Sequence, residues 1–276
     1  MTTPHVVITG GSSGIGLALA ALYLRRGARV SLVARTLPLL EAARDGLASG
    51  VPGAAARIAI GSADVTDRDQ LGPAMLALEA RQGPCDILVA SAGMVTPGTF
   101  DGQAPDVFER QIAVNLSGVA NSIRAVYPGM LSRRAGAIMI LSSGAGLTGL
   151  YGYSAYCASK FALRGLAGSL RAEARPAGIT VSIAFPPDTV TPQYLEELPL
   201  RPPEAEAVIG TVRPWPAEAV AAAILAGIDR GRAEVFIGLE LHALGRFGGL
   251  VRPLLDRWFD RLILRARRKA DAGRGS

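Results

Sequence analysis

A tyrosine and a lysine four positions apart could together carry acid–base chemistry. The stretch YGYSAYCASKFALRG, residues 151–165, puts Tyr156 and Lys160 at i and i+4, on one face of a helix. Both groups titrate near about pH 10 when unperturbed, so neither serves as an acid or a base at neutral pH. A lysine ammonium beside the phenol favours the phenolate and lowers the tyrosine pKa. We therefore predict that Tyr156 is a proton donor and Lys160 its partner, whereas Tyr151 and Tyr153 shape the pocket entrance.

The hydroxyl of Ser143 could hold the oxygen atom on which such chemistry acts. Ser143 follows the apolar run GAIMIL, residues 136–141, and open α/β sheets bind ligands beyond the carboxyl ends of their strands. If a hydride is delivered to a carbonyl group, negative charge develops on its oxygen, where a hydroxyl group can stabilise it. Ser142 is the alternative, because strand alternation turns one of two neighbouring side chains away.

Glycines between the first apolar run and the first helical pattern predict a phosphate-binding turn. The sequence ITGGSSGIG, residues 8–16, has the spacing TGxxxGxG, and a pyrophosphate is favoured at a helix N-terminus that the backbone can approach closely. The predicted contacts are Gly10, Ser12, Ser13, Gly14, Ile15 and Gly16. The same letters fit the G-x-S-x-G nucleophile elbow of hydrolases, but that site needs a histidine after the serine and only His242 follows. A dinucleotide site is therefore favoured over a hydrolase.

The residue after the second apolar run indicates which dinucleotide binds. NAD enzymes carry a carboxylate near this point for the ribose 2′-hydroxyl, whereas an arginine suits the 2′-phosphate of NADP. Here the run LVAR ends in Ala34 and Arg35, and a guanidinium is a permanently charged fork that pairs with phosphate. We predict NADPH as the cofactor. A solvated surface arginine is the alternative interpretation of Arg35.

Apolar runs alternate with helical patterns along most of the chain, which predicts a doubly wound α/β fold. Seven runs have the character of strands: HVVITG, RVSLVAR, RIAIGSADV, CDILVAS, GAIMILSS, GITVSIAF and AEVFIG. Their near-continuous hydrophobicity is typical of a parallel sheet covered by helices on both faces. We predict one Rossmann-type domain over residues 1–240. Residues 188–216, rich in proline and acidic residues, break the rhythm and are predicted to form a substrate loop or lid.

Residues 241–276 are predicted to form a basic tail with an amphipathic helix. Within it, residues 246–269 hold seven Arg and one Lys against two Asp, so this segment alone accounts for the net charge of +6. Such a helix lies on an anionic membrane surface, or packs on its own domain or on a partner subunit. Because charges balance in the rest of the chain, nucleic acid is not an expected partner. The apolar residues at helical spacing are Leu250, Val251, Leu254, Leu255, Trp258, Phe259, Leu262 and Ile263.

The bulk composition fits one large domain in a reducing compartment. The chain has 276 residues, 49% of them hydrophobic, which suffices for a substantial core. Its two cysteines, Cys85 and Cys157, make no disulfide framework and lack the spacing of a metal site. The first residues show no signal peptide, and no apolar run reaches the about 18 residues of a membrane span. We therefore expect a cytoplasmic protein, with peripheral contact to the cytoplasmic face of a membrane as an option.

Taken together, these motifs resemble the short-chain dehydrogenase/reductase family over about residues 4–240. The resemblance implies that Tyr156 is the acid/base, that Lys160 also binds the nicotinamide ribose, and that Ser143 positions the carbonyl group. The residues that carry the likeness are Thr9, Gly10, Gly14, Gly16, Asp64, Asn115, Ser143, Tyr156 and Lys160.

The same resemblance assigns expectations to five further residues. Asn115 would support a water-linked proton path, and Asp64, with Val65 beside it, would meet the adenine. The N-N-A-G motif of the family is replaced here by the residues ASAG at 90–93. Ala92 and Gly93 would therefore approach the cofactor without the usual asparagines.

Other segments resemble one branch of that family, the 3-ketodihydrosphingosine reductases. These segments are VVITGGSSGIG, LVAR, AYCASKFALRGLAGSLRAE and, above all, AFPPDTVTPQYLEE. The likeness implies NADPH-dependent reduction of a long-chain keto sphingoid base, with Pro186 and Thr189 near the nicotinamide carboxamide. Eukaryotic members carry a lysine where Leu39 stands, so the phosphate site would depend more heavily on Arg35.

Three interpretations of the function are open at this point. The first is a keto sphingoid base reductase, with the alkyl chain under residues 188–216 and the substrate ammonium attracted by Glu196, Glu197, Glu204 and Glu206. The second is the same chemistry on another hydrophobic ketone, such as a 3-oxoacyl group or a steroid. The third is a dinucleotide-binding regulator without turnover, which the intact serine, tyrosine and lysine set disfavours. Because the helix that holds Tyr156 forms dimer interfaces in the family, a homo-oligomer is expected.

Overall fold

The central element is a seven-stranded parallel sheet. The computed structural model describes residues 3–274. All seven strands pair in parallel, in the spatial order β3-β2-β1-β4-β5-β6-β9. The predicted doubly wound sheet is confirmed, and each predicted strand segment contains one of the strands. In chain order they are β1 (His5–Thr9), β2 (Arg29–Ala34), β3 (Ile58–Ser62), β4 (Ile87–Ala90), β5 (Gly136–Leu141), β6 (Ile179–Phe185) and β9 (Glu234–Phe236).

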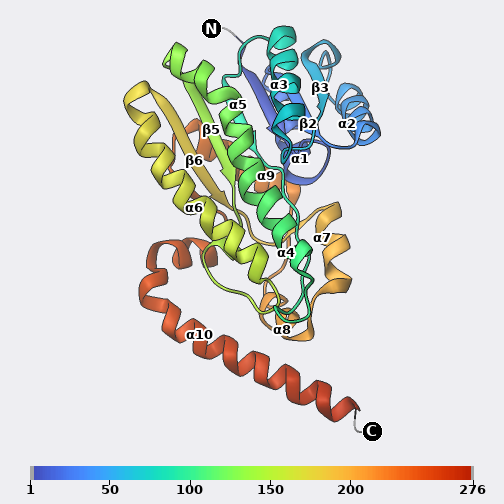
Figure 1. Ribbon diagram of the computed structural model, residues 1–276, viewed down its shortest axis with the longest axis vertical. Coiled ribbons are helices and arrows are strands. Elements are labelled where there is room, and N and C mark those ends of the chain that lie inside the picture. The colour runs from blue at the N-terminus through green and yellow to red at the C-terminus, as the bar shows by residue number, and fades with distance from the viewer. Residues whose placement is uncertain (1–2, 275–276) are drawn as a thin grey trace.

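Helices cover both faces of the sheet (Figure 1). Along β1, Val6 and Ile8 pack with the helices of one face and Val7 packs with those of the other. This alternation gives two apolar cores, as expected for strands that are hydrophobic on both sides. One face carries α1 (Gly14–Arg25), α2 (Leu37–Gly50) and α9 (Ala217–Asp229), and the other carries α3 (Arg68–Gln82), α5 (Gly118–Arg133) and α6 (Ser154–Ala174).

The order of the strands reverses between β1 and β4. The chain adds β2 and β3 outward on one side of β1, and then places β4, β5 and β6 on the other side. The connections therefore diverge at this point and leave a crevice beyond the carboxyl ends of β1 and β4. Open α/β sheets bind their ligands in such a crevice.

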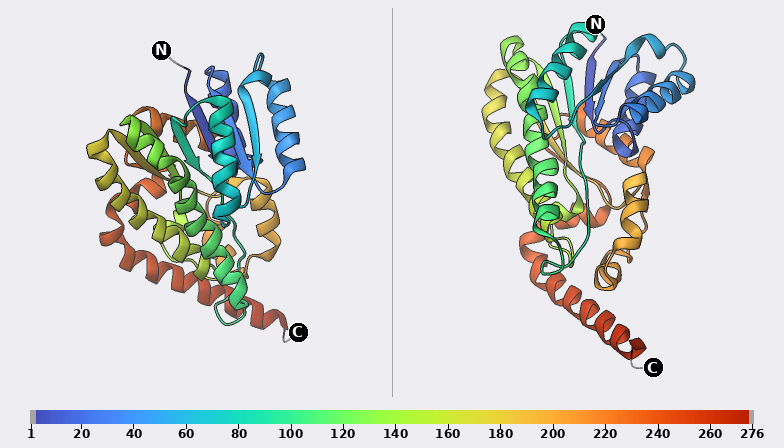
Figure 2. Two further views of the ribbon diagram at one scale, coloured as in Figure 1. Left: turned by 45° about the horizontal axis from the view of Figure 1, so that its top comes forward. Right: turned by 45° about the vertical axis from the view of Figure 1, so that its right-hand side comes forward.

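Residues 188–216, which we call the lid segment, form a small helical substructure after β6 (Figure 2). A two-residue parallel pair, β7 (Thr189–Val190) with β8 (Trp215–Pro216), closes its base. Between these strands stand α7 (Pro192–Glu197), a 3₁₀ turn (Leu198–Leu200) and α8 (Pro203–Ile209). Both helices begin with proline, which is favoured there because the first turn of a helix needs no backbone N–H donor.

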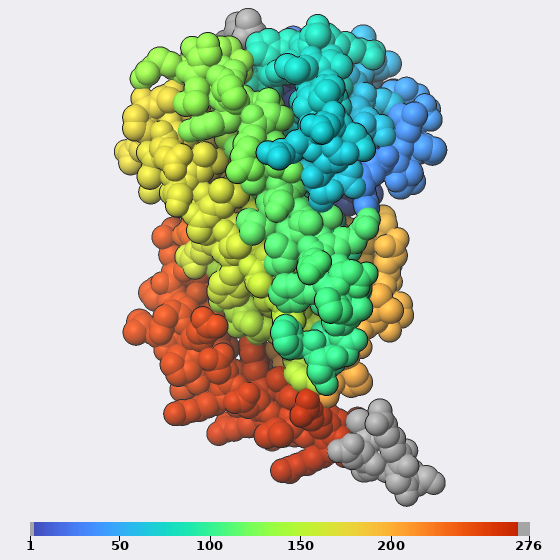
Figure 3. All heavy atoms as spheres, in the orientation of Figure 1, coloured from blue at the N-terminus to red at the C-terminus, as the bar shows by residue number. Residues whose placement is uncertain are grey.

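The C-terminal helix α10 (Leu239–Arg274) runs across the end of the molecule that carries the lid segment (Figures 2 and 3). It changes direction before its long final stretch (Figure 1). Its sequence contains Gly248, Gly249 and Pro253, residues that favour bends. Its first turns pack on the core, where Gly245 contacts the ring of Phe236 so closely that no side chain would fit. The tail therefore packs on its own domain, one of the three arrangements that the sequence left open. Within residues 3–274, no helix has the length and hydropathy of a membrane span.

Candidate active site

A cavity of about 810 Å³ lies beyond the carboxyl ends of the strands. The turn between β1 and α1 and the ends of the central strands line its inner part, whereas the lid segment and α10 line its outer part. Every predicted cofactor contact except Gly16 lines this cavity, and so do Ser143, Tyr156 and Lys160. Asn115 is the one predicted catalytic residue that lies behind the cavity wall. The topology thus brings together residues from most of the chain length.

The glycine-rich turn is shaped so that a diphosphate can lie against its backbone. Gly10 has a φ angle of +69°, and a Cβ atom there would lie 2.8 Å from the backbone of Ala92, so this position requires glycine. Gly16 does not line the cavity because it packs on the carbonyl oxygen of Gly10, where a side chain would collide. Helix α1 begins at Gly14 with no acidic residue in its first turn. Its positive end therefore lies at the cavity with no competing charge from that turn.

Arg35 and Asp64 form a charged rim at the ends of β2 and β3. Arg35 Nη1 lies 4.0 Å from Asp64 Oδ2, and the arginine side chain is 54% exposed. Burial raises the pKa of Asp64, but hydrogen bonds from the backbone N–H and the hydroxyl group of Thr66 outweigh it and hold the pKa below its usual value. Asp64 is therefore ionised at neutral pH, and the accessible guanidinium group can still pair with a phosphate. The guanidinium group of Arg35 and the backbone of the glycine-rich turn together fit a phosphorylated dinucleotide.

The two neighbouring serines after β5 have different surroundings. Ser142 Oγ donates to the carbonyl oxygen of Lys160 at 3.0 Å, so this hydroxyl group holds β5 to α6. Ser143 Oγ accepts the backbone N–H of Ala145 at 3.2 Å, and the Ser143 hydroxyl group lies near enough to the phenol of Tyr156 to lower its pKa. The geometry therefore favours Ser143 over Ser142 as the hydroxyl group that contacts a reacting oxygen.

Lys160 lies one helical turn after Tyr156 on α6, as their spacing predicts. Its Nζ donates to the carbonyl oxygen of Leu141 at 3.1 Å and lies 5.5 Å from the centre of the Tyr156 ring. Burial lowers the pKa of Lys160 to about 8. Burial also raises the pKa of Tyr156 above its usual value; the hydrogen bond with Ser143 offsets part of this rise, and the nearby carboxylate of Glu197 adds to it.

The predicted lowering of the tyrosine pKa is therefore wrong for this structure. The prediction weighed only the attraction between ammonium and phenolate, whereas removal of a phenol from water disfavours its charged form. The raised pKa has a chemical consequence, because Tyr156 stays protonated at neutral pH. A protonated phenol is the form that donates a proton to an oxygen that gains negative charge. Lys160 is mostly charged at neutral pH, and its role in stabilising the phenolate stays a prediction.

Asn115 stands in a π-helical turn, Ala113–Ser117, between α4 (Pro105–Ile112) and α5. Its buried amide Nδ2 donates to the carbonyl oxygen of Met94 at 2.9 Å and to Ser159 Oγ at 3.0 Å. It thereby ties the loop after β4 to α6, next to Lys160. A Cβ atom on Gly93 would lie 3.4 Å from Asn115 Oδ1 and 3.5 Å from Lys160 Nζ, which explains the close approach of that loop. Isolated π turns are frequent at functional sites, and the role of Asn115 in a proton path stays a prediction.

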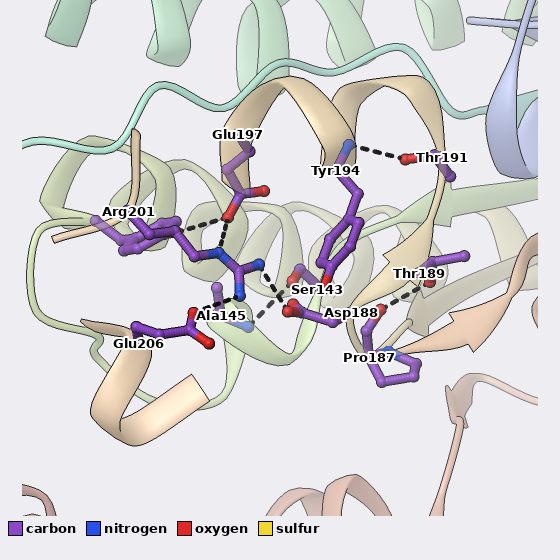
Figure 4. A network of polar contacts seen from close by, with 11 residues as sticks. Ser143, Ala145, Pro187, Asp188, Thr189, Thr191, Tyr194, Glu197, Arg201 and Glu206 are labelled. Carbon is purple, nitrogen blue, oxygen red and sulfur yellow. Dashed lines mark hydrogen bonds and ion pairs between the residues drawn. The ribbon is translucent and has the colours of Figure 1, made fainter. Parts of the chain in front are cut away.

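The lid segment contributes a buried ionic network that the sequence analysis did not identify (Figure 4). The guanidinium group of Arg201, with its side chain only 3% exposed, donates to Asp188 at 2.6 Å and to Glu197 at 2.9 Å. Tyr153 donates its hydroxyl proton to the same Glu197 at 2.5 Å. Because Tyr153 lies immediately before α6, the network couples the lid segment to the helix that carries Tyr156. The only signal in the sequence was the i, i+4 spacing of Glu197 and Arg201.

The acidic residues proposed to attract a substrate ammonium are largely engaged within the protein. Glu197 and Glu206 both pair with Arg201, at 2.9 and 3.6 Å, and Glu204 pairs with Arg267 at 3.2 Å. Glu196 is the one of the four without an ion pair in the described part of the chain. Their predicted role as a recognition site stays a prediction.

The chain has clear relatives among known proteins. A family model described as short chain dehydrogenase matches residues 4–197. The chain is 38% identical to the 3-ketodihydrosphingosine reductase of Bos taurus over 242 residues, which is 87% of this chain and 73% of the relative. It is 41% identical to the 3-dehydrosphinganine reductase TSC10B of Arabidopsis thaliana over 280 residues, 92% of this chain and 82% of the relative.

A solved structure shows the same likeness in three dimensions. The short-chain dehydrogenase from Sphingobium yanoikuyae in complex with NADPH superposes with a TM-score of 0.76 at 29% identity, covering 92% of this chain and 95% of that structure. Sequence motifs, sheet topology and relatives thus agree on an oxidoreductase that uses a nicotinamide dinucleotide. The chain belongs to the short-chain dehydrogenase/reductase family.

Proposed function

We propose that this enzyme reduces the ketone of a long-chain keto sphingoid base, 3-ketodihydrosphingosine, to the corresponding alcohol of sphingolipid biosynthesis. The observation that carries the proposal is a single cavity with two unlike halves. Its inner half holds Ser143, Tyr156 and Lys160. Its outer half includes apolar residues of the lid segment and α10, such as Ile209 and Phe259, beside polar ones such as Gln193. A polar head with a reactive carbonyl group and a long alkyl chain would match these halves. The names of the two relatives described above refer to this substrate.

Three residues of this chain have separate roles in the reduction of the carbonyl group. A bound nicotinamide dinucleotide would supply the hydride. Ser143 would donate a hydrogen bond to the carbonyl oxygen and stabilise its developing negative charge. Tyr156, held protonated by burial, would give its proton to that oxygen. The ammonium of Lys160 would then stabilise the phenolate and contact the nicotinamide ribose.

NADPH is the cofactor that we propose, rather than NADH. Arg35 lies at the end of β2, where NAD enzymes carry a carboxylate. Its half-exposed guanidinium group has only the distant Asp64 as an ionic partner in residues 3–274. Ser12 and Ser13 line the same cavity and offer hydroxyl groups to a phosphate. Leu39 also lines it and provides no second cation.

The direct test is an NADPH-oxidation assay on a panel of ketones. 3-Ketodihydrosphingosine should be reduced with the highest kcat/KM, ahead of 3-oxoacyl substrates and steroid ketones. A preference for either of those classes would replace the proposed substrate but keep the hydride chemistry. Absence of turnover with every ketone, together with intact NADPH binding, would instead support the dinucleotide-binding regulator.

We also propose that α10 contacts an anionic membrane surface. Its outward side exposes Leu250 (81%), Leu254 (66%) and Leu264 (53%), with exposed arginines such as Arg257 and Arg261 between them. Exposed leucines interleaved with cations are the pattern of helices that lie in the interface of an anionic bilayer. A keto sphingoid base is itself an amphiphile, so such contact would place the enzyme near its substrate. The expected location at a cytoplasmic membrane face belongs to this proposal.

A further inference from the structure

The inward side of α10 forms one wall of the cavity. Leu241, Leu244, Leu255, Trp258 and Phe259 all line it. They form two groups, Leu241 with Leu244 and Leu255 with Trp258 and Phe259, each at the spacing of one helix face. The first turns and a later part of α10 thus both contribute to the cavity wall. Val208, Ile209 and Val212 of the lid segment line the same cavity, and α8, which holds the first two, packs against α10. These apolar residues of α10 and the lid segment form one part of the lining of the outer half, which we call the slot. The rest of the outer lining includes polar residues such as Gln193, Glu197 and Glu240.

Arg267, near the C-terminal end of α10, contacts both the lid segment and the loop before α6. Its guanidinium group donates to Glu204 of α8 at 3.2 Å and to the hydroxyl group of Tyr151 at 2.9 Å. It also lies 5.3 Å from the centre of the Tyr151 ring. Tyr151 precedes the catalytic helix α6, and Glu204 belongs to the lid segment. These contacts bridge α10 to the lid segment and to the loop before α6, across the slot.

We infer that α10 is the wall against which the substrate alkyl chain packs, and that Arg267 is a positioning residue that holds this wall closed. The inference rests on the proposed function for the identity of the head group, but it concerns any ligand with a long alkyl chain. Because each buried methylene contributes about 0.8 kcal/mol, or about fourfold in affinity, the slot gives selectivity for long chains over short ones. Chain length would thus be selected by residues far along the sequence from the catalytic set.

The first test detects the alkyl chain beside α10 without requiring turnover. The chain has two tryptophans, Trp215 and Trp258, and both line the cavity. In a Trp215→Phe background, Trp258 is the sole reporter. Titration with a plain long-chain alkyl ketone should shift its emission to shorter wavelength, and a short-chain ketone should not. If the long-chain ketone binds, as calorimetry would show, and the emission stays unchanged, the inference is overturned. This result does not depend on the head group, so it separates failure of the inference from failure of the proposed function.

The second test measures selectivity for chain length. Phe259→Ala should lower kcat/KM for the long-chain keto base by about tenfold or more, mainly through KM, because it removes a wall of an apolar pocket. The short-chain analogue and NADPH binding should change by less than about twofold, an indication that the fold is intact. Equal losses for long and short chains, or no loss for either, would contradict the inference.

The role of Arg267 is tested by a double-mutant cycle with its partner. Arg267→Gln and Glu204→Gln should each lower the long-chain to short-chain ratio by about threefold, as expected for a partly exposed ion pair. Arg267→Gln also removes the contact with Tyr151, so the double variant should be no worse than Arg267→Gln alone, because Glu204→Gln removes only a contact that this variant has already lost. Arg265→Gln is the matched control, an exposed arginine of α10 that forms no ion pair in residues 3–274. A loss in the control as large as that of Arg267→Gln would refute a specific positioning role.

Discussion

Removal of the buried lysine should stabilise the protein while it abolishes the activity. Burial lowers the pKa of Lys160 from its usual 10.5 to about 8. At pH values below the folded-state pKa, that shift corresponds to about 3 kcal/mol of stability lost by keeping a charged lysine buried. Lys160→Met removes this cost and also the hydrogen bond to the carbonyl oxygen of Leu141, which is worth about 1 kcal/mol. We therefore expect the cofactor-free variant to be more stable than the wild type by about 2 kcal/mol at neutral pH.

The sign of the pH dependence provides a sharper test than the size of the gain. Between pH 8 and 10.5 the unfolded chain holds a proton on this lysine that the folded protein has lost, so the stability of the wild type rises with pH in this window. Urea unfolding of both cofactor-free proteins should be measured at about pH 7 and about pH 9.5. The difference in unfolding free energy between Lys160→Met and the wild type should narrow by about 2 kcal/mol at the higher pH, since all other titrating groups are shared. A gap that stays constant between these pH values would refute the claim that the lysine is buried at a cost.

Three further predictions concern residues away from that lysine. Arg35→Ala should reduce the preference for NADPH over NADH, measured as a ratio of kcat/KM values, by about tenfold or more, because a charge-assisted phosphate contact is lost. The control Arg44→Ala, at a partly exposed arginine of α2 that does not line the cavity, should leave the ratio unchanged. Equal efficiency with both cofactors in the wild type would contradict the role of Arg35. Arg201→Met leaves the carboxylates around it without their cation, so it should lower the free energy of unfolding in urea by about 3 kcal/mol. Arg26→Met, which breaks an exposed ion pair, should lower it by less than about 1 kcal/mol. Similar losses of stability in the two variants would contradict the burial of the network. Replacing Arg257 and Arg261 with Gln should weaken cosedimentation with anionic vesicles by about 30-fold, at about 1 kcal/mol per arginine near the surface. The charge-matched control, replacement of Arg171 and Arg175, should leave it unchanged, and equal binding by all three proteins would argue against contact through α10.

The sequence was most informative where a local pattern determines the geometry. Continuous apolar runs predicted all seven parallel strands, and the i, i+4 spacing predicted that Tyr156 and Lys160 share a face of one helix. Strand alternation left two possible serines, and only the contact of Ser142 with Lys160 distinguished them. These features depend on residues close together in the chain, so their spacing carries the information.

What the sequence could not provide depends on contacts between distant segments. The tyrosine pKa was predicted in the wrong direction, because burial of Tyr156 is a property of the whole cavity and not of its spacing to Lys160. The position of α10 likewise depends on tertiary contacts, such as Gly245 against Phe236 and Arg267 against Glu204. The expected homo-oligomer stays a prediction, which light scattering of the purified protein would test.

The measurement that bears most directly on the account is turnover and dinucleotide binding in Tyr156→Phe. The substitution removes one hydroxyl group and keeps the ring that packs in the cavity wall. We expect NADPH-dependent reduction of the keto substrate to fall by about 10²- to 10⁴-fold, the range typical of a lost general acid, with NADPH affinity unchanged. Turnover at the wild-type rate in a variant that still binds NADPH would contradict Tyr156 as the proton donor.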